Sequence, residues 1–489
     1  MLSTLLIVPL IGAILVAILP DRTRSIASAV AIAVIAWTVL LLTKFDLSNP
    51  GMQFGENFTW IDTLGLSYRL GIDGLSLPLV ALNSLLTWVA IYSSDEKIQR
   101  PRLYYSLILI LNAAVSGVFL AQDLLLFFIS YELELIPLYL LIAIWGGQKR
   151  AYAATKFLIY TALSGALILA AFLGLAWFGG SNSFIYNPAL SAALPLSQQL
   201  LLLGALLLGF GIKMPLFPFH TWLPDAHVEA STPISVLLAG VLLKLATYGI
   251  LRFCVGLFPE AWQVAAPWLS IWAIVSVLYG ALMAIAQADM KKMVAYSSVS
   301  HMGYILLAAA ANTPLSFSAA MIQMVSHGLI SATLFLLVGV VYKKTKTRDI
   351  NVLQGLLNPE RGMPVIGSLM VISVMASAGI PGMVGFIAEF LIFRSSFPIF
   401  PVQTLLCMIG TGLTAVYYLL LINKAFFGRL SAPVQNLEAV TWQERYPAMI
   451  LTVAIVLFGL QPSWITRWSE PTIAATLHQP PAIVASVTK

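Results

Sequence analysis

The chain has 489 residues, of which 60% are hydrophobic and only 9% are charged. The mean hydropathy of +0.91 excludes an ordinary soluble domain and predicts an integral membrane protein surrounded by lipids. The net charge of +6 does not call for a nucleic-acid partner, because the basic residues concentrate in connections between apolar stretches.

Apolar stretches of membrane-spanning length recur along the whole chain, which predicts an all-α polytopic fold with about fourteen transmembrane helices. The first helix should be retained, since no small-residue cleavage site follows Pro20. The predicted helices start near residues 3, 25, 76, 103, 123, 151, 197, 231, 263, 293, 315, 363, 401 and 446.

Three connections lack spanning character. Residues 45–75 combine acidic, glycine and aromatic residues and predict an external loop with short strands. Residues 179–196 are rich in Gly, Ser, Asn and Pro, which predicts a second external loop, and residues 343–362 form a basic connection. None of these connections is long enough to form a domain of its own.

The basic residues divide unequally between the two sides of the membrane. With fourteen spans, seventeen Lys and Arg residues fall in odd-numbered loops and six fall on the other side. The positive-inside rule then places the odd loops in the cytoplasm and both termini on the lumenal or periplasmic side. One missed span would scramble this division, so it also supports the helix count.

Two predicted helices, the seventh and the twelfth, contain helix-breaking residues beside an ionisable side chain. Because five spans separate them, related units must have opposite orientations, which predicts two inverted five-helix repeats. The expected division is residues 1–102, 103–257, 263–427 and 428–489. The alternative is that Gly and Pro only permit packing kinks. The residues concerned are Gly209, Gly211 and Pro215 near Lys213, and Gly379, Pro381, Gly382 and Gly385 before Glu389.

Four ionisable residues, Glu132, Lys213, Lys244 and Glu389, lie well inside apolar stretches. A charge at the centre of a bilayer costs about 3 kcal/mol on insertion scales, so such residues usually face water or a partner charge. Their arrangement on four helices predicts a route for protons or small cations. A purely structural role for each residue is the alternative.

Further polar side chains extend this set. His301 and His327 are candidate proton carriers, because a neutral imidazole both donates and accepts a hydrogen bond. Secondary candidates are Glu134, Lys156, His220 and His227. Cys254 and Cys407 stand alone in apolar segments, so we expect no iron–sulfur cluster, no metal site and no cofactor in this chain.

The segment from Lys213 to His227, KMPLFPFHTWLPDAH, resembles the antiporter-like membrane subunits of respiratory complex I and of Mrp-type cation/proton antiporters. The resemblance extends through residues 238–249 and 289–303, Ser326-His327-Gly328, and residues 385–390. It covers about residues 70–430. The glutamate of the twelfth helix and the Glu132-to-Pro137 segment are similar to the subunit-4 type of chain in the photosynthetic NDH-1 of cyanobacteria and plastids.

The resemblance implies a role for each membrane charge. Glu132 is expected to pair with Lys213, because the family pairs a helix-five glutamate with a helix-seven lysine. A carboxylate stabilises a buried ammonium, so moving it away would favour loss of the proton. Lys244 is expected to be the central relay and Glu389 the terminal group, at the repeat position of Lys213. Glu134, about 200° round the helix from Glu132, should lie in a different environment.

The implied function is proton translocation in the membrane arm of an NAD(P)H- or ferredoxin-dependent quinone oxidoreductase. The quinone, the iron–sulfur clusters and the electron donor are expected in other subunits, so this chain carries out no redox chemistry alone. Expected partners are other NDH-1 membrane subunits, especially antiporter-like chains. The expected location is a cyanobacterial thylakoid, with a bacterial inner membrane or a plastid thylakoid as alternatives.

Tyr131 stands where the family usually has Trp, and Ser231 where most members have Pro. Both departures resemble cyanobacterial variants of carbon dioxide-uptake complexes, which implies a CO2-hydration subunit as a partner. Two other functions remain open from the sequence. One is an Mrp-type sodium/proton antiporter subunit, and the other is a structural module that anchors peripheral subunits.

Overall fold

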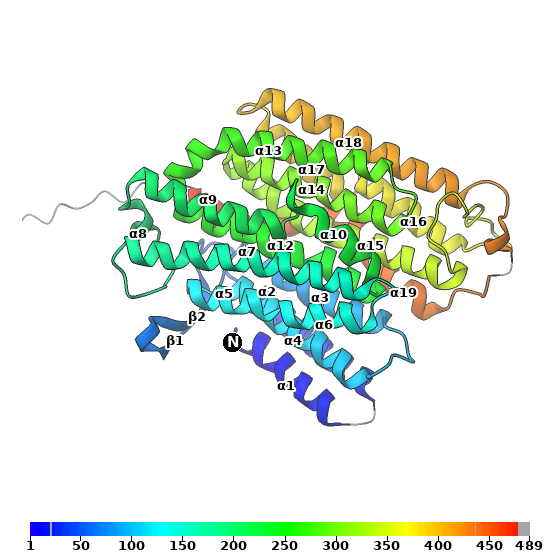
Figure 1. Ribbon diagram of the computed structural model, residues 1–489, viewed down its shortest axis with the longest axis horizontal. Helices are drawn as coiled ribbons and strands as arrows, with labels where there is room; N and C mark the ends of the chain where they lie inside the picture. Colours follow the sequence, from blue (N-terminus) through cyan, green and yellow to red (C-terminus); the bar gives the residue numbers. More distant parts are fainter. Residues whose placement is uncertain (20–21, 436, 478–489) are drawn as a thin grey trace, which may run out of the picture.

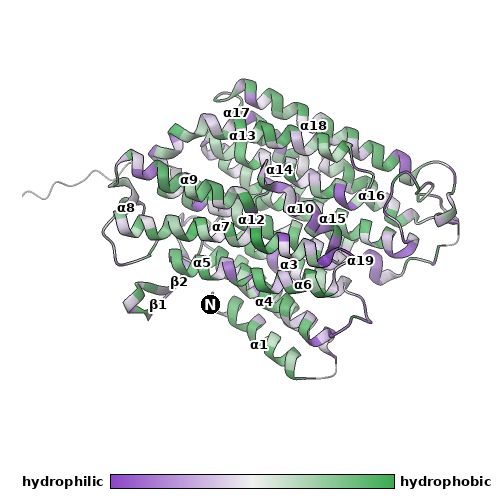
Figure 2. Ribbon diagram, in the orientation of Figure 1, coloured by the Kyte–Doolittle hydropathy of each residue, from purple (hydrophilic) through white to green (hydrophobic). Residues whose placement is uncertain are grey.

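The computed structural model describes residues 1–19, 22–435 and 437–477. Its helices lie side by side and run roughly parallel to the long axis of the molecule, with α1 (Thr4–Ile18) at one edge and α18 (Pro401–Leu421) at the other (Figure 1). Hydrophobic residues cover the helices, and hydrophilic residues gather in the connections at the ends of the bundle (Figure 2).

The first half of the described chain contains one β-hairpin and a series of helices. The elements are α2 (Thr23–Lys44), β1 (Gln53–Ile61), η1 (Asp62–Leu64), β2 (Leu66–Ile72), α3 (Leu77–Ser93), α4 (Pro101–Leu120), α5 (Leu124–Leu133), α6 (Leu135–Trp145), α7 (Arg150–Phe178), α8 (Pro188–Ala192), α9 (Leu196–Lys213), η2 (Phe219–Thr221) and α10 (Trp222–Glu229).

The second half is helical throughout. The elements are α11 (Thr232–Leu237), η3 (Leu238–Leu242), α12 (Leu243–Gly249), η4 (Ile250–Val255), α13 (Pro259–Ile285), α14 (Met290–Ala311), α15 (Pro314–Thr345), α16 (Pro364–Ser377), α17 (Val384–Ser396), η5 (Ile422–Phe426), η6 (Ala432–Val434), α19 (Trp442–Leu460) and α20 (Ser463–Leu477).

Every predicted apolar stretch corresponds to a helix or to a pair of consecutive helices, so the all-α membrane fold is confirmed. Within the described residues, eleven helical spans are long and apolar enough to cross a membrane, and α1, α3 and α16 are shorter apolar helices. The count of fourteen crossings therefore stays a prediction. Helix α20 follows the last predicted span and was not expected from the sequence.

The short strands predicted in residues 45–75 are confirmed. Strands β1 and β2 form an antiparallel two-stranded sheet. The hairpin lies at the same end of the bundle as α8, which belongs to the second predicted external loop (Figure 1). The loops expected on the opposite side contact one another there: Lys343 lies 3.1 Å from Asp95, and Arg348 lies 3.2 Å from Asp289.

Both predicted helix breaks are present. Helix α9 ends at Lys213, and the chain runs without regular helix through Pro215 before η2 and α10. Helix α16 ends at Ser377, and α17 begins after a turn in which Gly379 and Gly382 adopt φ values of +71° and +91°. Such a backbone conformation favours glycine, which explains the breaking effect of these two residues.

The glycines before Lys213 have a different role from the predicted one. Gly209 and Gly211 lie inside α9 rather than at its break. A Cβ on Gly209 would lie 2.9 Å from the Ser164 carbonyl oxygen of α7, so this glycine permits close packing of the two helices. Gly385 similarly lies inside α17, where a Cβ would collide with the Ala376 carbonyl oxygen.

Corresponding features of the two predicted repeats match in the structure. Asp123 caps the N-terminus of α5 and bridges to Ile185, and Asp289 caps α14 and bridges to Asp349. The predicted spans that start near residues 231 and 401 end in the π-helical segments η4 and η5, respectively. These matches support the inverted repeats, whose exact boundaries stay a prediction.

The comparison of the two repeats shows that the expectation of equivalent positions for Lys213 and Glu389 is wrong. Lys213 is the last residue before its break, whereas Glu389 lies in α17, after the second break. The residue that ends the corresponding helix α16 is Ser377. Proximity to a glycine-rich break in the sequence does not show on which side of the break a side chain lies.

Candidate proton path

Lys213 forms a buried ion pair with Glu134, and neither side chain is exposed. The expectation that Glu132 is its direct partner is therefore wrong for this structure. The Lys213 ammonium also lies 3.5 Å from the centroid of the Tyr131 ring, a cation–π contact that further stabilises the charged form. The pair joins the α5–α6 junction to the end of α9.

A local irregularity explains why the position of Glu134 was predicted wrongly. The prediction for Glu134 assumed one continuous helix, but α5 ends at Leu133 and α6 begins at Leu135, so Glu134 occupies the junction. Glu132 instead lies against Gly165 of α7, where a Cβ would collide with its carboxylate. Glu132 is partly exposed, and its Oε1 has no hydrogen-bond partner among the described residues.

Lys244 lies within helical segments of unusual geometry. The π-helical segments η3 and η4 flank the short α-helix α12 that carries it. Its buried Nζ donates to the Ala239 carbonyl oxygen of η3 and lies 2.8 Å from His327 Nδ1 of α15. Widened π-helical turns are frequent at functional sites. The contact with His327 is the first link of a chain of polar groups.

The chain of polar groups continues from His327 to Glu389. The His327 and His301 ring centroids are 5.6 Å apart, and His301 Nδ1 lies 3.6 Å from Glu389 Oε1. Thr411 of α18 donates a hydrogen bond of 2.8 Å to the other carboxylate oxygen. Four of the six principal sequence-predicted residues are therefore brought together, in the order Lys244, His327, His301 and Glu389.

Neutral polar side chains that were not predicted from the sequence complete this cluster. Gln323 Nε2 lies 3.3 Å from His301 Nδ1, and Ser377 Oγ lies 3.2 Å from His301 Nε2. Gln323 is four residues before His327 on α15 and thus shares its helix face, a spacing that was visible in the sequence. No comparable spacing in the sequence indicates a role for Ser377.

A small cavity borders the histidines and Glu389. Its volume is about 10 Å³, roughly the space needed by one water molecule, and its lining includes His301, Gln323, His327 and Glu389. His327 Nε2 has no hydrogen-bond partner among the described residues. One water at this position would connect the two imidazoles to the carboxylate.

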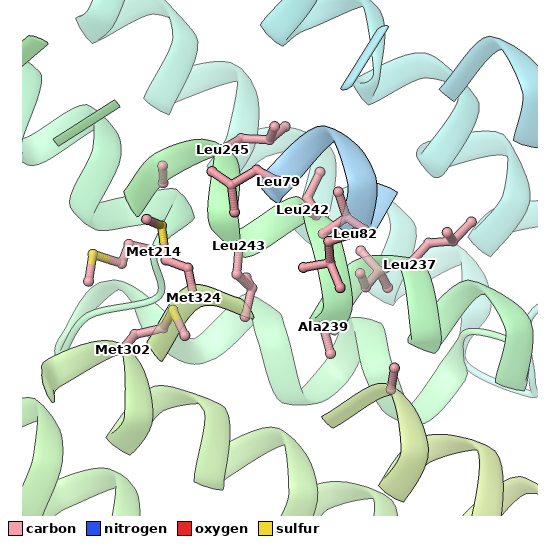
Figure 3. Close-up of a cluster of buried hydrophobic side chains, with 14 of the residues drawn as sticks. Leu79, Leu82, Met214, Leu237, Ala239, Leu242, Leu243, Leu245, Met302 and Met324 are labelled. Carbon is pink, nitrogen blue, oxygen red and sulfur yellow. The ribbon is translucent and has the colours of Figure 1, made fainter. Parts of the chain in front are cut away.

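An apolar cluster contains side chains from η3, α12, α14 and α15, together with Met214 (Figure 3). Met214, which follows Lys213, lies near Met302 and Met324 from the helices that carry His301 and His327. Leucines of η3 and α12 pack in the same cluster. Methionine side chains are flexible and adapt to changes in their surroundings. Among the described residues, no hydrogen bond or ion pair joins the Lys213–Glu134 pair to Lys244, His327, His301 or Glu389.

Three of the secondary candidates, Lys156, His220 and His227, make no hydrogen bond or ion pair with this series among the described residues. Lys156 pairs with Asp225 of α10 at 2.8 Å. His220 packs 4.8 Å from Tyr279, and His227 stacks 4.4 Å from Phe335, in both cases between ring centroids. Neither histidine has a hydrogen-bond partner for its ring nitrogens among the described residues.

Cationic side chains hold the C-terminus of α10 beside these histidines. Lys291 Nζ donates to the Ala230 carbonyl oxygen at 2.6 Å, and Arg348 donates to that of Val228 at 3.1 Å. Cations at the end of a helix stabilise its exposed carbonyls and complement its dipole. These contacts fix the second half of the broken helix relative to α14 and α15.

Comparisons with known proteins show the family to which the chain belongs. The family model "NADH:quinone oxidoreductase/Mrp antiporter, TM" matches residues 121–414. The chain is 44% identical to NAD(P)H-quinone oxidoreductase chain 4-2 of Synechocystis sp. over 89% of this chain and 80% of that protein. It is 41% identical to chain 4 1 of Picosynechococcus sp., with coverage of 95% and 89%.

Solved structures share the whole fold. A chain of respiratory complex I from Thermus thermophilus superposes with a TM-score of 0.88 at 28% identity, covering 98% of this chain and 99% of that chain. A chain of the Mrp complex from Dietzia sp. gives 0.87 at 22% identity, with 98% of each chain covered, which shows the fold alone. The chain therefore belongs to the family of NADH:quinone oxidoreductase and Mrp antiporter transmembrane subunits.

Proposed function

We propose that protons move along Lys244, His327, His301 and Glu389 in this chain, which is a proton-translocating membrane-arm subunit of an NAD(P)H-quinone oxidoreductase. The observation that carries the proposal is the series of closely spaced ionisable groups from the Lys244 ammonium to the Glu389 carboxylate. Each group in the series can donate or accept a proton, and the small cavity beside them has room for a bridging water.

The Lys213–Glu134 pair acts as the control element of the relay. A buried ammonium beside a carboxylate keeps its proton, and removal of the carboxylate would favour its release. Glu132, two residues from Glu134, offers a second carboxylate at the partly exposed surface between α5 and α7. An exchange of Lys213 between these acids would change the field at Lys244 without a direct contact.

The test uses the assembled oxidoreductase with Lys244→Ala in this chain. We expect electron transfer to quinone to continue while the number of protons translocated per electron falls. Lys156→Ala is the matched control, because it removes a membrane lysine outside the series. Normal proton translocation by assembled Lys244→Ala complexes would refute the relay. Failure of assembly in every such variant would instead favour the structural module.

The partners and cofactors of the complex follow from the same assignment. We propose that other antiporter-like chains adjoin this one and that quinone, iron–sulfur clusters and the electron donor bind elsewhere in the complex. The resemblance of Tyr131 and Ser231 to carbon-uptake variants supports a CO2-hydration subunit as a further partner. Mass spectrometry of the purified complex tests this: a carbonic anhydrase-like protein is expected, and its consistent absence contradicts the carbon-uptake assignment.

We also propose a thylakoid location with the basic loops in the cytoplasm. The similarity to cyanobacterial chains supports the location, and the excess of basic residues in the odd-numbered connections supports the orientation. A cysteine introduced at Arg361 should react with a membrane-impermeant reagent only from the cytoplasmic side. Labelling from the lumenal side alone would reverse the assignment.

A further inference from the structure

A large cavity lies at the basic end of the bundle, away from the relay. Its volume is about 800 Å³, and residues from the ends of six membrane helices line it. Arg24 belongs to the start of α2, Tyr92 to the end of α3, and Thr232 to the start of α11. The end of α15 and the start of α19 close the ring. The cavity therefore lies at the level where helices leave the membrane.

The acidic residues of the lining are already compensated by cations. Lys343 lies 3.1 Å from Asp95, and Lys343 and Lys344 each lie 3.2 Å from Glu444. Arg24 lies 3.7 Å from Glu96. Lys97 and Lys346 also line the cavity. Neither lysine has an ion pair or side-chain hydrogen bond with any other residue that the structure describes. The lining thus presents two uncompensated cations beside neutralised acids, a combination that favours an anion.

The rest of the lining is suited to hydrocarbon. Pro233 of α11 and Leu336 and Val340 of α15 contribute the apolar part of the lining. The opening is flanked by an aromatic cluster, in which Tyr92 packs 5.2 Å from Trp88 and 5.8 Å from Tyr446. Aromatic residues of this kind mark the boundary between the hydrocarbon region and the headgroups. Cationic and apolar surfaces therefore share one cavity at the membrane boundary.

We propose that this cavity binds an anionic membrane lipid. The phosphate or sulfonate of the headgroup lies between Lys97 and Lys346, and an acyl chain covers the apolar lining formed with Leu336 and Val340. A free inorganic anion would use the two lysines alone and leave the apolar surface uncovered. Basic pockets between transmembrane helices bind anionic headgroups for the same electrostatic reason.

The test is lipid analysis of the complete purified complex carrying Lys97→Gln and Lys346→Gln together. We expect a tightly retained anionic lipid to be held more weakly, by roughly fivefold for each lysine. The matched control combines Lys149→Gln and Arg361→Gln, which removes two exposed cations at the same end of the bundle but outside the cavity. Mass spectrometry distinguishes a phospholipid from a sulfolipid as the lost species, and either result supports the proposal.

A second variant separates lipid from a free anion. Val340→Trp should fill part of the apolar surface and displace the lipid while both lysines remain, whereas a free anion would stay bound. Equal retention of every anionic lipid by the lysine variant, the control and the unaltered complex would overturn the proposal. Loss of inorganic anions only, with unchanged lipid, would overturn it as well.

Discussion

Lys213 and Glu134 form an ion pair in which both side chains are completely buried. Two charges removed from solvent in this way attract each other strongly, but both have lost their hydration. Such a pair stabilises the fold only while both members are charged and in contact. This makes it sensitive to any group that competes for either member, and Glu132 is a second carboxylate only two residues away.

The two glutamates should respond differently to substitution. Glu134→Ala leaves the Lys213 ammonium buried without its partner, which destabilises the subunit by about 3–5 kcal/mol. Glu132→Ala should cost much less, because Glu132 is partly exposed and makes no direct bond to Lys213. Thermal unfolding of the purified complex measures both. The reverse ranking would show that Glu132 is the resting partner.

Removal of either relay histidine should interrupt translocation. His301→Ala removes the group between His327 and Glu389, so we expect the proton-to-electron ratio to fall while electron transfer continues. His220→Ala serves as the control, because its ring packs against Tyr279 and makes no hydrogen bond to any member of the series among the described residues. Equal losses in the two variants would argue against a defined route.

Ser377→Ala tests the part played by the end of α16. The hydroxyl lies 3.2 Å from His301 Nε2 and should hold the ring with Nδ1 towards Glu389. Its loss should cost about 1 kcal/mol in stability and lower the rate of proton transfer several-fold. Ser377→Thr retains the hydroxyl and should restore most of the rate. An unchanged rate in Ser377→Ala would show that the hydroxyl does not orient the ring.

Substitution of two glycines of α9 tests whether Gly209 is needed for helix packing. A Cβ at position 209 would lie 2.8 Å from an Ile168 side-chain carbon and 2.9 Å from the Ser164 carbonyl oxygen, so Gly209→Ala should destabilise the subunit by about 1–3 kcal/mol. Gly204 of the same helix has nothing within 4 Å of the built Cβ, and Gly204→Ala should be neutral or stabilising. Assembly yield and unfolding temperature measure both effects. Equal tolerance of the two substitutions would remove the packing role of Gly209.

Much of the fold and of the candidate site can be predicted from the sequence, because the hydrophobicity and charge of the residues determine these features. The apolar stretches, the β-hairpin and both helix breaks are predicted from residue type and spacing. Lys244, His301, His327 and Glu389 stand out because ionisable groups are expensive in a membrane. Gln323 was accessible by the same reasoning, from its position one turn before His327.

Other details depend on backbone geometry that residue types do not specify. The resemblance points to Glu132 as the partner of Lys213, and the assumption of a continuous helix places Glu134 elsewhere, whereas Glu134 lies at the junction between α5 and α6 and pairs with Lys213. The π-helical segments around Lys244 are equally hidden, because their residues, apart from Arg252, are ordinary apolar types. The equivalence of Lys213 with Ser377 required the observed ends of α9 and α16.

The central claim is that protons reach Glu389 from Lys244 through the two histidines. Infrared difference spectroscopy during turnover of the complex reports the protonation of a buried carboxyl group directly. We predict a carboxyl band that changes on turnover, disappears in Glu389→Gln, and no longer changes in Lys244→Met. A Glu389 band that still changes with full amplitude in Lys244→Met would contradict the proposed route.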